Sequence, residues 1–369
     1  MRLLLTGGGT AGHVNPALAI AEIFKKNCPS AEILFAGTDQ GIERRLVAEA
    51  GYPFFAIEAM GLSRSLSPKN LRALYLALRG PHTAARLLRR LEPHLVVGTG
   101  GYVSWPILSA AARLGIPCAV HESNASPGLT VRRLAPRVDA VLLNFQEAAE
   151  QLPKGVHAVR VGNPLRSGFS SLSREEARRR LGIPPAAHLL LSFGGSLGAE
   201  AINTAMLRLI SEYTAKAPSV FHIHGCGARY YESYEKALRA RLGDLPHRIR
   251  VSAYLEQMPE LMAAADLIIC RAGAMTVSEV ARAGRASILI PSPNVAGDHQ
   301  TKNAKALADL GAAVLMPEDD CESKLTETVA RLLSAHEDRA RMEAAAKAFG
   351  LPDANKRVYL ALMELLKTK

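Results

Sequence analysis

Short apolar runs alternate with helix-length amphipathic segments along almost the whole chain. The runs lack the polar alternation of half-buried strands, and each is bounded by Gly, Pro or a charged segment. Both features are typical of parallel strands that are buried on both faces. We expect strands within residues 2–6, 32–37, 53–57, 94–99, 117–122, 140–145, 157–162, 188–195, 219–225, 249–255, 266–273, 286–292 and 312–318. The pattern therefore predicts a doubly wound α/β fold.

The alternation of apolar runs and amphipathic segments is interrupted after residue 162 by a segment rich in Gly, Pro and Ser, and it resumes at residue 188. We place a domain boundary close to Asn163, which predicts an N-terminal domain over 1–163 and a second Rossmann-like domain over 164–349. An amphipathic segment follows Gly350 and Pro352. We expect this terminal helix, over about 350–369, to pack back on the N-terminal domain.

Charge and composition narrow the class of partner. The formal net charge is +11 and the pI is near 9.6, which favours anionic partners. Aromatic residues make up 5%, and no basic segment is interleaved with them, so nucleic acid is not expected. The five cysteines are scattered and the chain has no apolar stretch of membrane-spanning length. We expect a cytoplasmic protein with reduced thiols and no bound metal or cofactor.

A glycine loop, "TGGGTAGHVNP", follows the first expected strand. Gly7, Gly9 and Gly12 match G-x-G-x-x-G, and glycines at such a turn let backbone N–H groups approach a phosphate beside a helix N-terminus. We expect that helix to begin with Asn15 as its N-cap and Pro16 as its first residue. Two alternatives are a purely structural turn and a dinucleotide enzyme with Asp39 as its ribose acid.

A histidine stands in this loop. His13 would crowd a dinucleotide, but it is well placed for acid–base work on another ligand. The positive helix end disfavours the imidazolium and keeps the ring able to accept a proton. The alternative is a histidine that only hydrogen-bonds the loop.

Three more glycine-bearing loops follow expected strands, at 98–104, 194–200 and 270–279. Ligands of open α/β sheets bind at such strand ends, so the four loops imply a cleft between two domains that holds phosphates from both sides. In the last loop, the amides of residues 274–278 and the Thr276 and Ser278 hydroxyls would face a diphosphate. Glu279 would accept both hydroxyls of a ribose, unless it serves only as a partner of the helix dipole.

Residues 59–91 contain seven cations and no acidic residue: Arg64, Lys69, Arg72, Arg79, Arg86, Arg89 and Arg90. Leu71, Leu74, Tyr75 and Leu78 fall on one face of a helix that Ser67-Pro68 can start and Gly80-Pro81 can stop. This face is either part of the core or, with Arg72 and Arg79, a membrane patch that meets anionic headgroups.

Seven motifs, in this order and spacing, resemble the MurG family: "GGGTAGHVNPALAIA", "GTGGYVSWP", "HESNASPGLT", "VGNPLR", "FGGSLGA", "CRAGAMTVSE" and "DHQTKNA". The resemblance implies a GT-B fold, with two Rossmann-like domains facing across a cleft. It implies an inverting transferase that moves N-acetylglucosamine from UDP-N-acetylglucosamine to the 4-hydroxyl of the muramoyl sugar of lipid I, making lipid II. It also implies a peripheral protein on the cytoplasmic side of the inner membrane, near anionic lipids and other cell-wall synthesis proteins.

The resemblance also implies site residues. Those of the donor site are Thr10, Ala11, Gly12, Asn124, Arg166, Ser196, Leu255, Ala274, Met275, Thr276, Val277, Ser278, Glu279 and Gln300. We assign the acceptor pyrophosphate to Gly7, Gly8, Gly9, Gly100, Gly101 and Tyr102. His13 is the candidate general base, with Glu122 or a phosphate of the acceptor as alternatives. His299 stands where other members carry a second glutamine, and Leu255 stands at a position that is often isoleucine.

Two rival interpretations differ from this one in a testable way. One is a GT-B transferase with a soluble or sterol-like acceptor, and the other is an NAD-binding oxidoreductase or sensor. Binding of UDP but not of NAD would separate the transferases from the second class.

Overall fold

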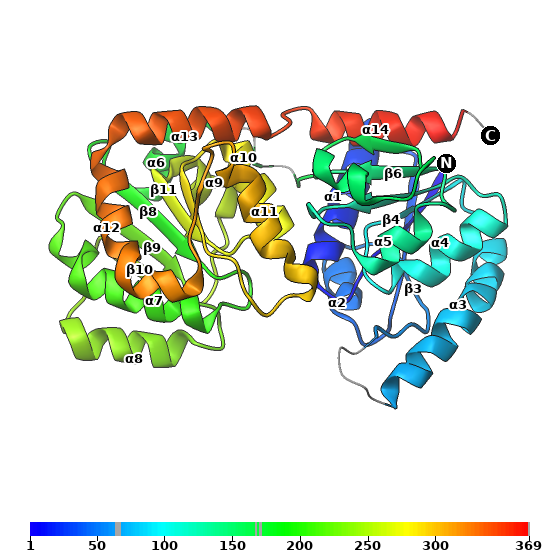
Figure 1. Cartoon of the computed structure of the whole chain (residues 1–369), viewed down its shortest axis with the longest axis horizontal. Coiled ribbons are helices and arrows are strands. Elements are labelled where there is room, and N and C mark those ends of the chain that lie inside the picture. The colour runs from blue at the N-terminus through cyan, green and yellow to red at the C-terminus, as the bar shows by residue number, and fades with distance from the viewer. Residues whose placement is uncertain (63–67, 167, 170–171, 368–369) are drawn as a thin grey trace. The chain divides into compact units, whose positions relative to one another are not determined.

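The computed structural model describes residues 1–62, 68–166, 168–169 and 172–367. The chain divides into two compact units (Figure 1). The N-terminal unit comprises Met1–Ser167 together with Asp353–Lys369, and the C-terminal unit comprises Gly168–Pro352. The division at Ser167 lies shortly after Asn163.

The N-terminal unit is built on a parallel sheet of seven strands in the order β3-β2-β1-β4-β5-β6-β7. The chain runs outward from β1 in one direction and from β4 in the other, so the topological switch point lies between β1 and β4. Its strands are β1 (Arg2–Thr6), β2 (Glu32–Gly37), β3 (Phe54–Ala56), β4 (Leu95–Gly98), β5 (Cys118–Glu122), β6 (Ala140–Leu143) and β7 (Ala158–Arg160).

The C-terminal unit is built on a parallel sheet of six strands in the order β10-β9-β8-β11-β12-β13, with its switch point between β8 and β11. Its strands are β8 (His188–Phe193), β9 (Val220–Gly225), β10 (Ile249–Ser252), β11 (Leu267–Cys270), β12 (Ser287–Leu289) and β13 (Val314–Leu315).

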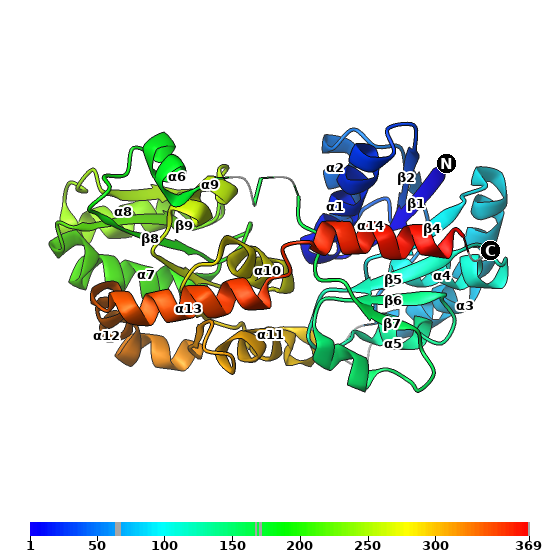
Figure 2. The same ribbon diagram turned by 90° about the horizontal axis from the view of Figure 1, so that it is seen from above.

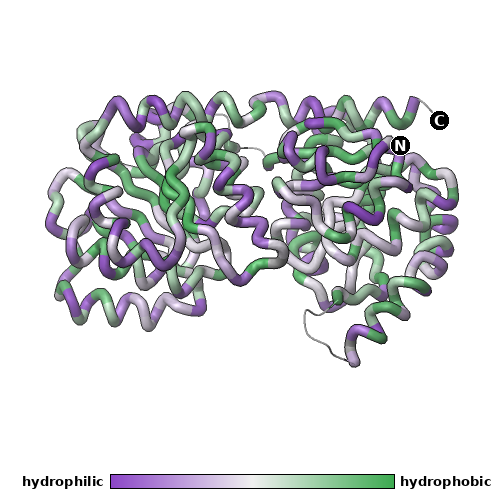
Figure 3. Tube along the Cα trace, viewed as in Figure 1, coloured by the Kyte–Doolittle hydropathy of each residue, from purple (hydrophilic) through white to green (hydrophobic). Residues whose placement is uncertain are grey.

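Every segment in which we expect a strand contains one, and the doubly wound fold is confirmed. The physical reason is visible in β1: Leu3 and Leu5 join the core on one side of the sheet and Leu4 joins the core on the other, and all three are fully buried. Both faces of the strand are covered, so the run is apolar throughout. Figure 3 shows the same hydrophobic character along the central strands of the C-terminal unit.

The helices of the N-terminal unit are α1 (Ala11–Asn27), α2 (Ile42–Glu49), α3 (Lys69–Leu91), α4 (Ser104–Arg113), α5 (Leu129–Leu134) and α14 (Ala354–Leu365). Figure 2 shows α14 alongside α1. Val358 and Leu362 of α14 are fully buried in this unit's core, and the ring of Tyr359 lies 5.2 Å from that of Phe24.

The helices of the C-terminal unit are α6 (Arg174–Leu181), α7 (Glu200–Glu212), α8 (Tyr231–Leu242), α9 (Met258–Ala264), α10 (Ala274–Ala283), α11 (His299–Ala308), α12 (Cys321–Ser334) and α13 (His336–Phe349). Leu190 and Leu267 of the sheet and Leu332 of α12 belong to its core.

The expected start of the first helix is wrong. The helix α1 begins at Ala11 with Thr10 as its N-cap, and Pro16 lies inside it. The missing N–H of Pro16 leaves the carbonyl of Gly12 without its helical partner. Gly12 is exposed, so water can satisfy that carbonyl and the helix need not begin at the proline.

The expected end of the basic helix is also wrong, because α3 continues through Gly80-Pro81 to Leu91. Pro81 cannot donate to the carbonyl of Ala77, but the indole N–H of Trp105 on α4 donates to that oxygen at 2.8 Å. Gly80 permits the close approach of α4, since a Cβ there would lie 3.1 Å from Pro106. Arg64 and Ser67 lie outside the described residues.

The apolar face of α3 is exposed. Leu71 is 74% exposed, Leu78 is 69% exposed, and Leu74 and Tyr75 are each more than half exposed, so the core interpretation of this face is wrong. The opposite face carries the buried Ala73 and Leu76. No helix within the described ranges is both long enough and apolar enough to cross a membrane.

Candidate active site

Two glycine loops flank the switch point of the N-terminal unit. One follows β1 at Gly7–Thr10 and the other follows β4 at 99–102, and Thr6 is the register partner of Gly98. The loops touch through backbone: a Cβ on Gly101, whose φ is +75°, would lie 2.2 Å from the carbonyl oxygen of Gly8. Only glycine permits this approach, so the two loops form one surface at the carboxyl ends of the strands.

His13 lies between these loops. Its Nδ1 is 3.1 Å from the carbonyl oxygen of Gly8 and 3.1 Å from the hydroxyl of Thr10. A carbonyl oxygen only accepts, so the bond to Gly8 requires the proton on Nδ1 and leaves the lone pair on Nε2. The ring packs on Gly100, where a Cβ would lie 2.9 Å from Cδ2. His13 is therefore held in the tautomer with its proton on Nδ1.

Glu43 of α2 is a residue that the sequence interpretation missed. It is 1% exposed, and its carboxylate accepts from the amide of Gly9 at 3.1 Å, from the amide of Thr38 at 3.0 Å, and from the Thr38 hydroxyl. The amide of Gly9 is therefore occupied by the protein and does not face a ligand phosphate. The available signal was its spacing: Glu43 lies four residues before the apolar Val47, on the same face of α2, and both are buried. By contrast, Asp39 pairs with Arg44 at the surface.

Glu122, at the end of β5, is 4% exposed. One oxygen accepts from the amide and the side chain of Asn124, at 2.9 and 3.0 Å, and the other accepts from the amide of Gly128 at 2.8 Å. Burial raises the pKa of Glu122, and these hydrogen bonds lower it. Both oxygens are engaged, so Glu122 positions Asn124 and its loop.

Two loops likewise flank the switch point of the C-terminal unit. One follows β8 at Gly194–Gly198 and the other follows β11 at 271–273, and the strand ends Phe193 and Cys270 are register partners. The first loop packs on the loop after β9, because a Cβ on Gly198 would lie 2.0 Å from the carbonyl oxygen of Cys226. Ser196 and Leu197, at its tip, are exposed.

The second loop leads into α10, for which Gly273 is the N-cap. The amides of Met275 and Thr276 lie in the first turn, where they have no intrahelical acceptor. Our expectation that the amide of Val277 is also open is wrong, because it donates to the carbonyl of Gly273 at 2.9 Å. Amides in the first turn of a helix are suited to bind an anion.

Glu279 lies one turn further along α10, and burial raises its pKa to about 8. Its carboxyl has no hydrogen-bond partner among the described residues. A half-buried carboxyl with no hydrogen-bond partner among the described residues, at the carboxyl end of a parallel sheet, is a candidate ligand-binding group.

The remaining predicted donor residues lie on three other segments. Leu255 packs over Gly225, where a Cβ would lie 2.8 Å from the leucine side chain. Gln300 of α11 accepts from the amide of Ser292 at 2.8 Å, which fixes its side chain. Arg166 belongs to the N-terminal unit, where it donates to Glu22 of α1 at 2.7 Å.

The structure thus brings the predicted residues together in two groups, one in each unit. Gly8, Gly9 and His13 meet the loop of Gly100, Gly101 and Tyr102, while Ser196 and residues 274–279 share the switch point of the other sheet. In the part of the chain that is described, no group of three or more His, Cys, Asp or Glu side chains is arranged to hold a metal ion.

The chain matches two family models in succession. Residues 3–143 match the N-terminal domain of glycosyltransferase family 28, and residues 189–358 match its C-terminal domain. The UDP-N-acetylglucosamine–N-acetylmuramyl-(pentapeptide) pyrophosphoryl-undecaprenol N-acetylglucosamine transferase of Desulforudis audaxviator is 43% identical over 96% of this chain and 95% of its own length. The transferase of the same name from Acetivibrio thermocellus is 40% identical over 100% and 99%.

The fold comparison agrees. The crystal structure of Acinetobacter baumannii MurG matches with a TM-score of 0.78 and 29% identity, over 98% of this chain and 99% of that one. The UDP-GlcNAc 2-epimerase from Neisseria meningitidis, at 13% identity and a TM-score of 0.66, shares the fold alone. With two parallel doubly wound sheets, a glycine loop pair at each switch point and relatives of this similarity, the chain has the GT-B fold and belongs to the MurG family of glycosyltransferases.

Proposed function

We propose that this protein is the UDP-N-acetylglucosamine-dependent transferase that converts lipid I to lipid II for peptidoglycan synthesis. The observation that carries this function is full-length identity of about 40% to transferases of that name. The helix N-terminus at the start of α10, with Glu279 further along the same helix, also supports this function. The rival oxidoreductase interpretation fails because the family is a glycosyltransferase family.

The C-terminal unit holds the donor in this proposal. The first-turn amides of α10 receive the diphosphate, together with Ser196 and the Thr276 and Ser278 hydroxyls. The Glu279 carboxylate accepts hydrogen bonds from the two ribose hydroxyls. The backbone at Leu255 contacts uracil, and the Gln300 side chain hydrogen-bonds the hydroxyls of the sugar. Val277 supports this site through its buried side chain. Arg166, Asn124 and the α1 start at Thr10–Gly12 are the contributions of the N-terminal unit.

The N-terminal unit holds the acceptor, with its pyrophosphate at the loops of Gly7, Gly8, Gly100, Gly101 and Tyr102. Gly9 takes part by shaping the loop, since its amide is bound to Glu43. Nε2 of His13 removes the proton of the muramoyl 4-hydroxyl as that oxygen attacks C1 of the donor sugar. The bond from C1 to the diphosphate breaks, the configuration at C1 inverts, and UDP leaves. The α10 amides and Arg166 stabilise the charge on UDP.

The exposed face of α3 attaches the protein to the cytoplasmic side of the inner membrane as a peripheral protein. Leu71, Leu74, Tyr75 and Leu78 enter the interface, and Arg72 and Arg79 meet anionic headgroups. The guanidinium of Arg79 lies 5.7 Å from the Tyr75 ring, so apolar and basic groups are presented together. A lipid-linked acceptor requires such docking.

The decisive experiment is transfer from UDP-N-acetylglucosamine to a short-chain lipid I analogue by the purified protein. We expect a disaccharide product whose new linkage is β, as determined by NMR. Calorimetry should show binding of UDP and none of NAD. Failure to glycosylate the analogue while UDP binds would favour a transferase with another acceptor.

A further inference from the structure

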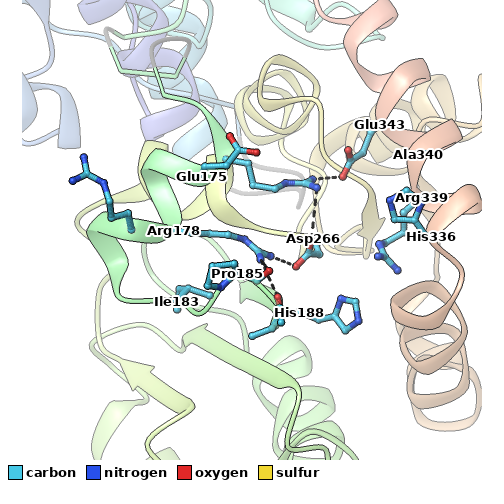
Figure 4. Close-up of a pocket in the computed structure, with 14 residues that line it drawn as sticks. Glu175, Arg178, Ile183, Pro185, His188, Asp266, His336, Arg339, Ala340 and Glu343 are labelled. Carbon is cyan, nitrogen blue, oxygen red and sulfur yellow. Dashed lines mark hydrogen bonds and ion pairs between the residues drawn. The ribbon is translucent and has the colours of Figure 1, made fainter.

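The C-terminal unit contains a second pocket, of about 680 Å³, which none of the donor residues lines. It lies at the amino ends of β8 and β11, beginning at His188 and beside Asp266. The donor loops follow the carboxyl ends of the same two strands, so the pocket is at the opposite edge of the sheet. Its other walls are α6, the segment that joins α6 to β8, and the start of α13 (Figure 4). Its volume is in the range of sites for small organic ligands.

One side of the pocket is a completed ion network. Asp266 pairs with Arg178, lies 3.7 Å from Arg174, and accepts from the amide of Leu189 at 2.7 Å. Arg174 also pairs with Glu343. Through Nε and Nη1, Arg178 also donates to the carbonyls of Pro185, Ala187 and Ala264. The charges on this side are balanced within the protein, although Nε of Arg174 is buried without a hydrogen-bond partner among the described residues.

On the other side of the pocket, a buried arginine has no counter-charge. Arg339 of α13 is 6% exposed and has no carboxylate partner among the described residues. Its Nη1 donates to the carbonyls of Leu332 and Leu333, which leaves its Nε and Nη2 donors without a protein acceptor within the described ranges. A buried guanidinium without a counter-charge is costly, so this position favours an anion.

Two imidazoles complete that side. Figure 4 shows His188 directed toward α13, from which Arg339 and His336 project. Neither imidazole has a hydrogen-bond partner in the described part of the chain. Burial lowers the pKa of His188, Asp266 raises it, and the charges of Arg339 and Arg178 lower it further, so this ring lies among charged groups.

The rest of the lining is apolar. Ile183, Pro185, Ala187 and Ala340 line the pocket beside these donors. Such a surface would contact the carbon skeleton of a ligand whose charged end lies against Arg339. Glu175, which is exposed, is the acid on the lining that forms no ion pair with an arginine among the described residues.

We propose that this pocket is a binding site for a small organic phosphate, whose phosphate group accepts from Arg339, His188 and His336. A phosphate has more terminal oxygens than a carboxylate and matches the planar fork of an arginine, which favours it over a carboxylate ligand. Because the site is at the opposite edge of the sheet from the donor loops, its ligand binds together with UDP and does not compete with it.

The test is calorimetric titration of phenyl phosphate into the full-length protein saturated with UDP, so that the donor site is already occupied. We expect one additional site, weaker binding of inorganic phosphate, and weaker binding still of benzoate. The double variant His188→Ala/His336→Ala should bind phenyl phosphate at least about tenfold more weakly, since it loses two charge-assisted hydrogen bonds. It should bind UDP like the wild type, which establishes that it is folded.

Two further variants sharpen the result. Glu175→Gln removes the acid from the rim and should tighten phenyl phosphate binding. His247→Ala removes an exposed imidazole elsewhere in the same unit and should change nothing. Equal affinity in the double variant and the wild type would overturn the proposal. So would the absence of binding to the UDP-saturated protein at about 10 mM phenyl phosphate and low salt. Tighter binding of benzoate than of phenyl phosphate would overturn the phosphate class.

Discussion

At the scale of single residues, hydrogen-bond partners decide what each acidic side chain can contribute. Glu43 and Glu122 are buried with their carboxylate oxygens bound to backbone amides. Such carboxylates fix the loops to which those amides belong. Glu279 has no such partner in the described part of the chain, and it is therefore the acid available to a ligand.

Glu279→Gln should raise the KM for UDP-N-acetylglucosamine about 10- to 150-fold at pH above 8 and leave kcat nearly unchanged. The ribose is bound alike in the ground and transition states, and one charge-assisted interaction is worth about 1.5–3 kcal/mol. Glu322→Gln is a matched control, because Glu322 lies in the first turn of α12 and pairs with Arg208. A fall in kcat at constant KM would contradict the ribose role.

The raised pKa of Glu279 predicts that donor affinity depends on pH. With its pKa raised to about 8 by burial, Glu279 is mostly protonated below that pH and must lose its proton to accept two hydroxyls. Donor affinity should therefore rise with pH by up to about tenfold per unit toward pH 8 and level off above it. The penalty of Glu279→Gln should shrink as the pH falls to 6. Calorimetry with UDP-N-acetylglucosamine measures both, and a pH-independent wild-type affinity would contradict the linkage.

His13→Ala should lower kcat about 10²- to 10⁴-fold at saturating substrates, the usual loss when a general base is removed. Its pH–rate profile should lose the acid limb, because the imidazole that accepts the proton is absent. Glu122→Gln should keep that limb, since the Glu122 oxygens are engaged by Asn124 and Gly128. Retention of more than a tenth of kcat in His13→Ala would assign the histidine to the loop structure alone.

Glu43→Gln should raise the KM for the lipid I analogue about tenfold or more, because an amide group cannot accept from both Thr38 and Gly9 and the loop loses one fixed hydrogen bond. UDP binding should change much less, since most of the proposed donor residues lie in the C-terminal unit and Glu43 lies in the N-terminal unit. Glu43→Asp, which keeps the charge on a shorter side chain, should recover part of the acceptor affinity. Equal loss of UDP affinity would show a general folding defect instead.

At the scale of elements, α3 shows how a neighbour can change what a helix does. Trp105 satisfies the carbonyl that Pro81 leaves open, so one continuous helix carries both the exposed apolar face and the arginines beyond the proline. Arg72, Arg79, Arg86, Arg89 and Arg90 are exposed along it.

Vesicles of phosphatidylglycerol or cardiolipin should bind the protein, and salt should weaken that binding. Cations near an anionic surface contribute about 1 kcal/mol each. Leu74→Glu/Tyr75→Glu should reduce vesicle binding and leave UDP binding intact. Leu310→Glu, at an exposed leucine of the other unit, is the control. Co-sedimentation measures binding, and the fluorescence of Trp105, the chain's one tryptophan, reports on α3. No binding at low salt would contradict the membrane patch.

At the scale of the whole molecule, the two units have separate hydrophobic cores. We expect two thermal transitions, of which UDP raises mainly that of the C-terminal unit, where most of the proposed donor residues lie. At a concentration of 100 times its Kd, UDP would stabilise that unit by about 2.7 kcal/mol, or about 5–10 °C. Calorimetry should show the shift, while Trp105 fluorescence, which reports on the N-terminal unit, should move much less. A single transition that moves as one would show that the units unfold together.

Local patterns in the sequence were sufficient to predict the parallel strands, the two-domain organisation of the fold and the four glycine loops. These features follow from local patterns: a strand buried on both faces must be apolar throughout, as Leu3, Leu4 and Leu5 are, and a loop that touches backbone must be glycine, as Gly101 is. The last of these loops also led to the prediction that the start of α10 and Glu279 bind the donor.

Interactions between residues that are distant in the sequence could be identified only from the folded structure. Pro81 reads as a helix stop until Trp105, from another helix, supplies the missing donor. Glu43 reads as a surface acid until the fold places it beneath Gly9. His188 and Arg339 are 151 positions apart in the numbering and line one pocket only because β8 and α13 adjoin there. Each outcome depends on a partner that no local pattern specifies, since hydrogen bonds and charge balance are set by neighbours in space.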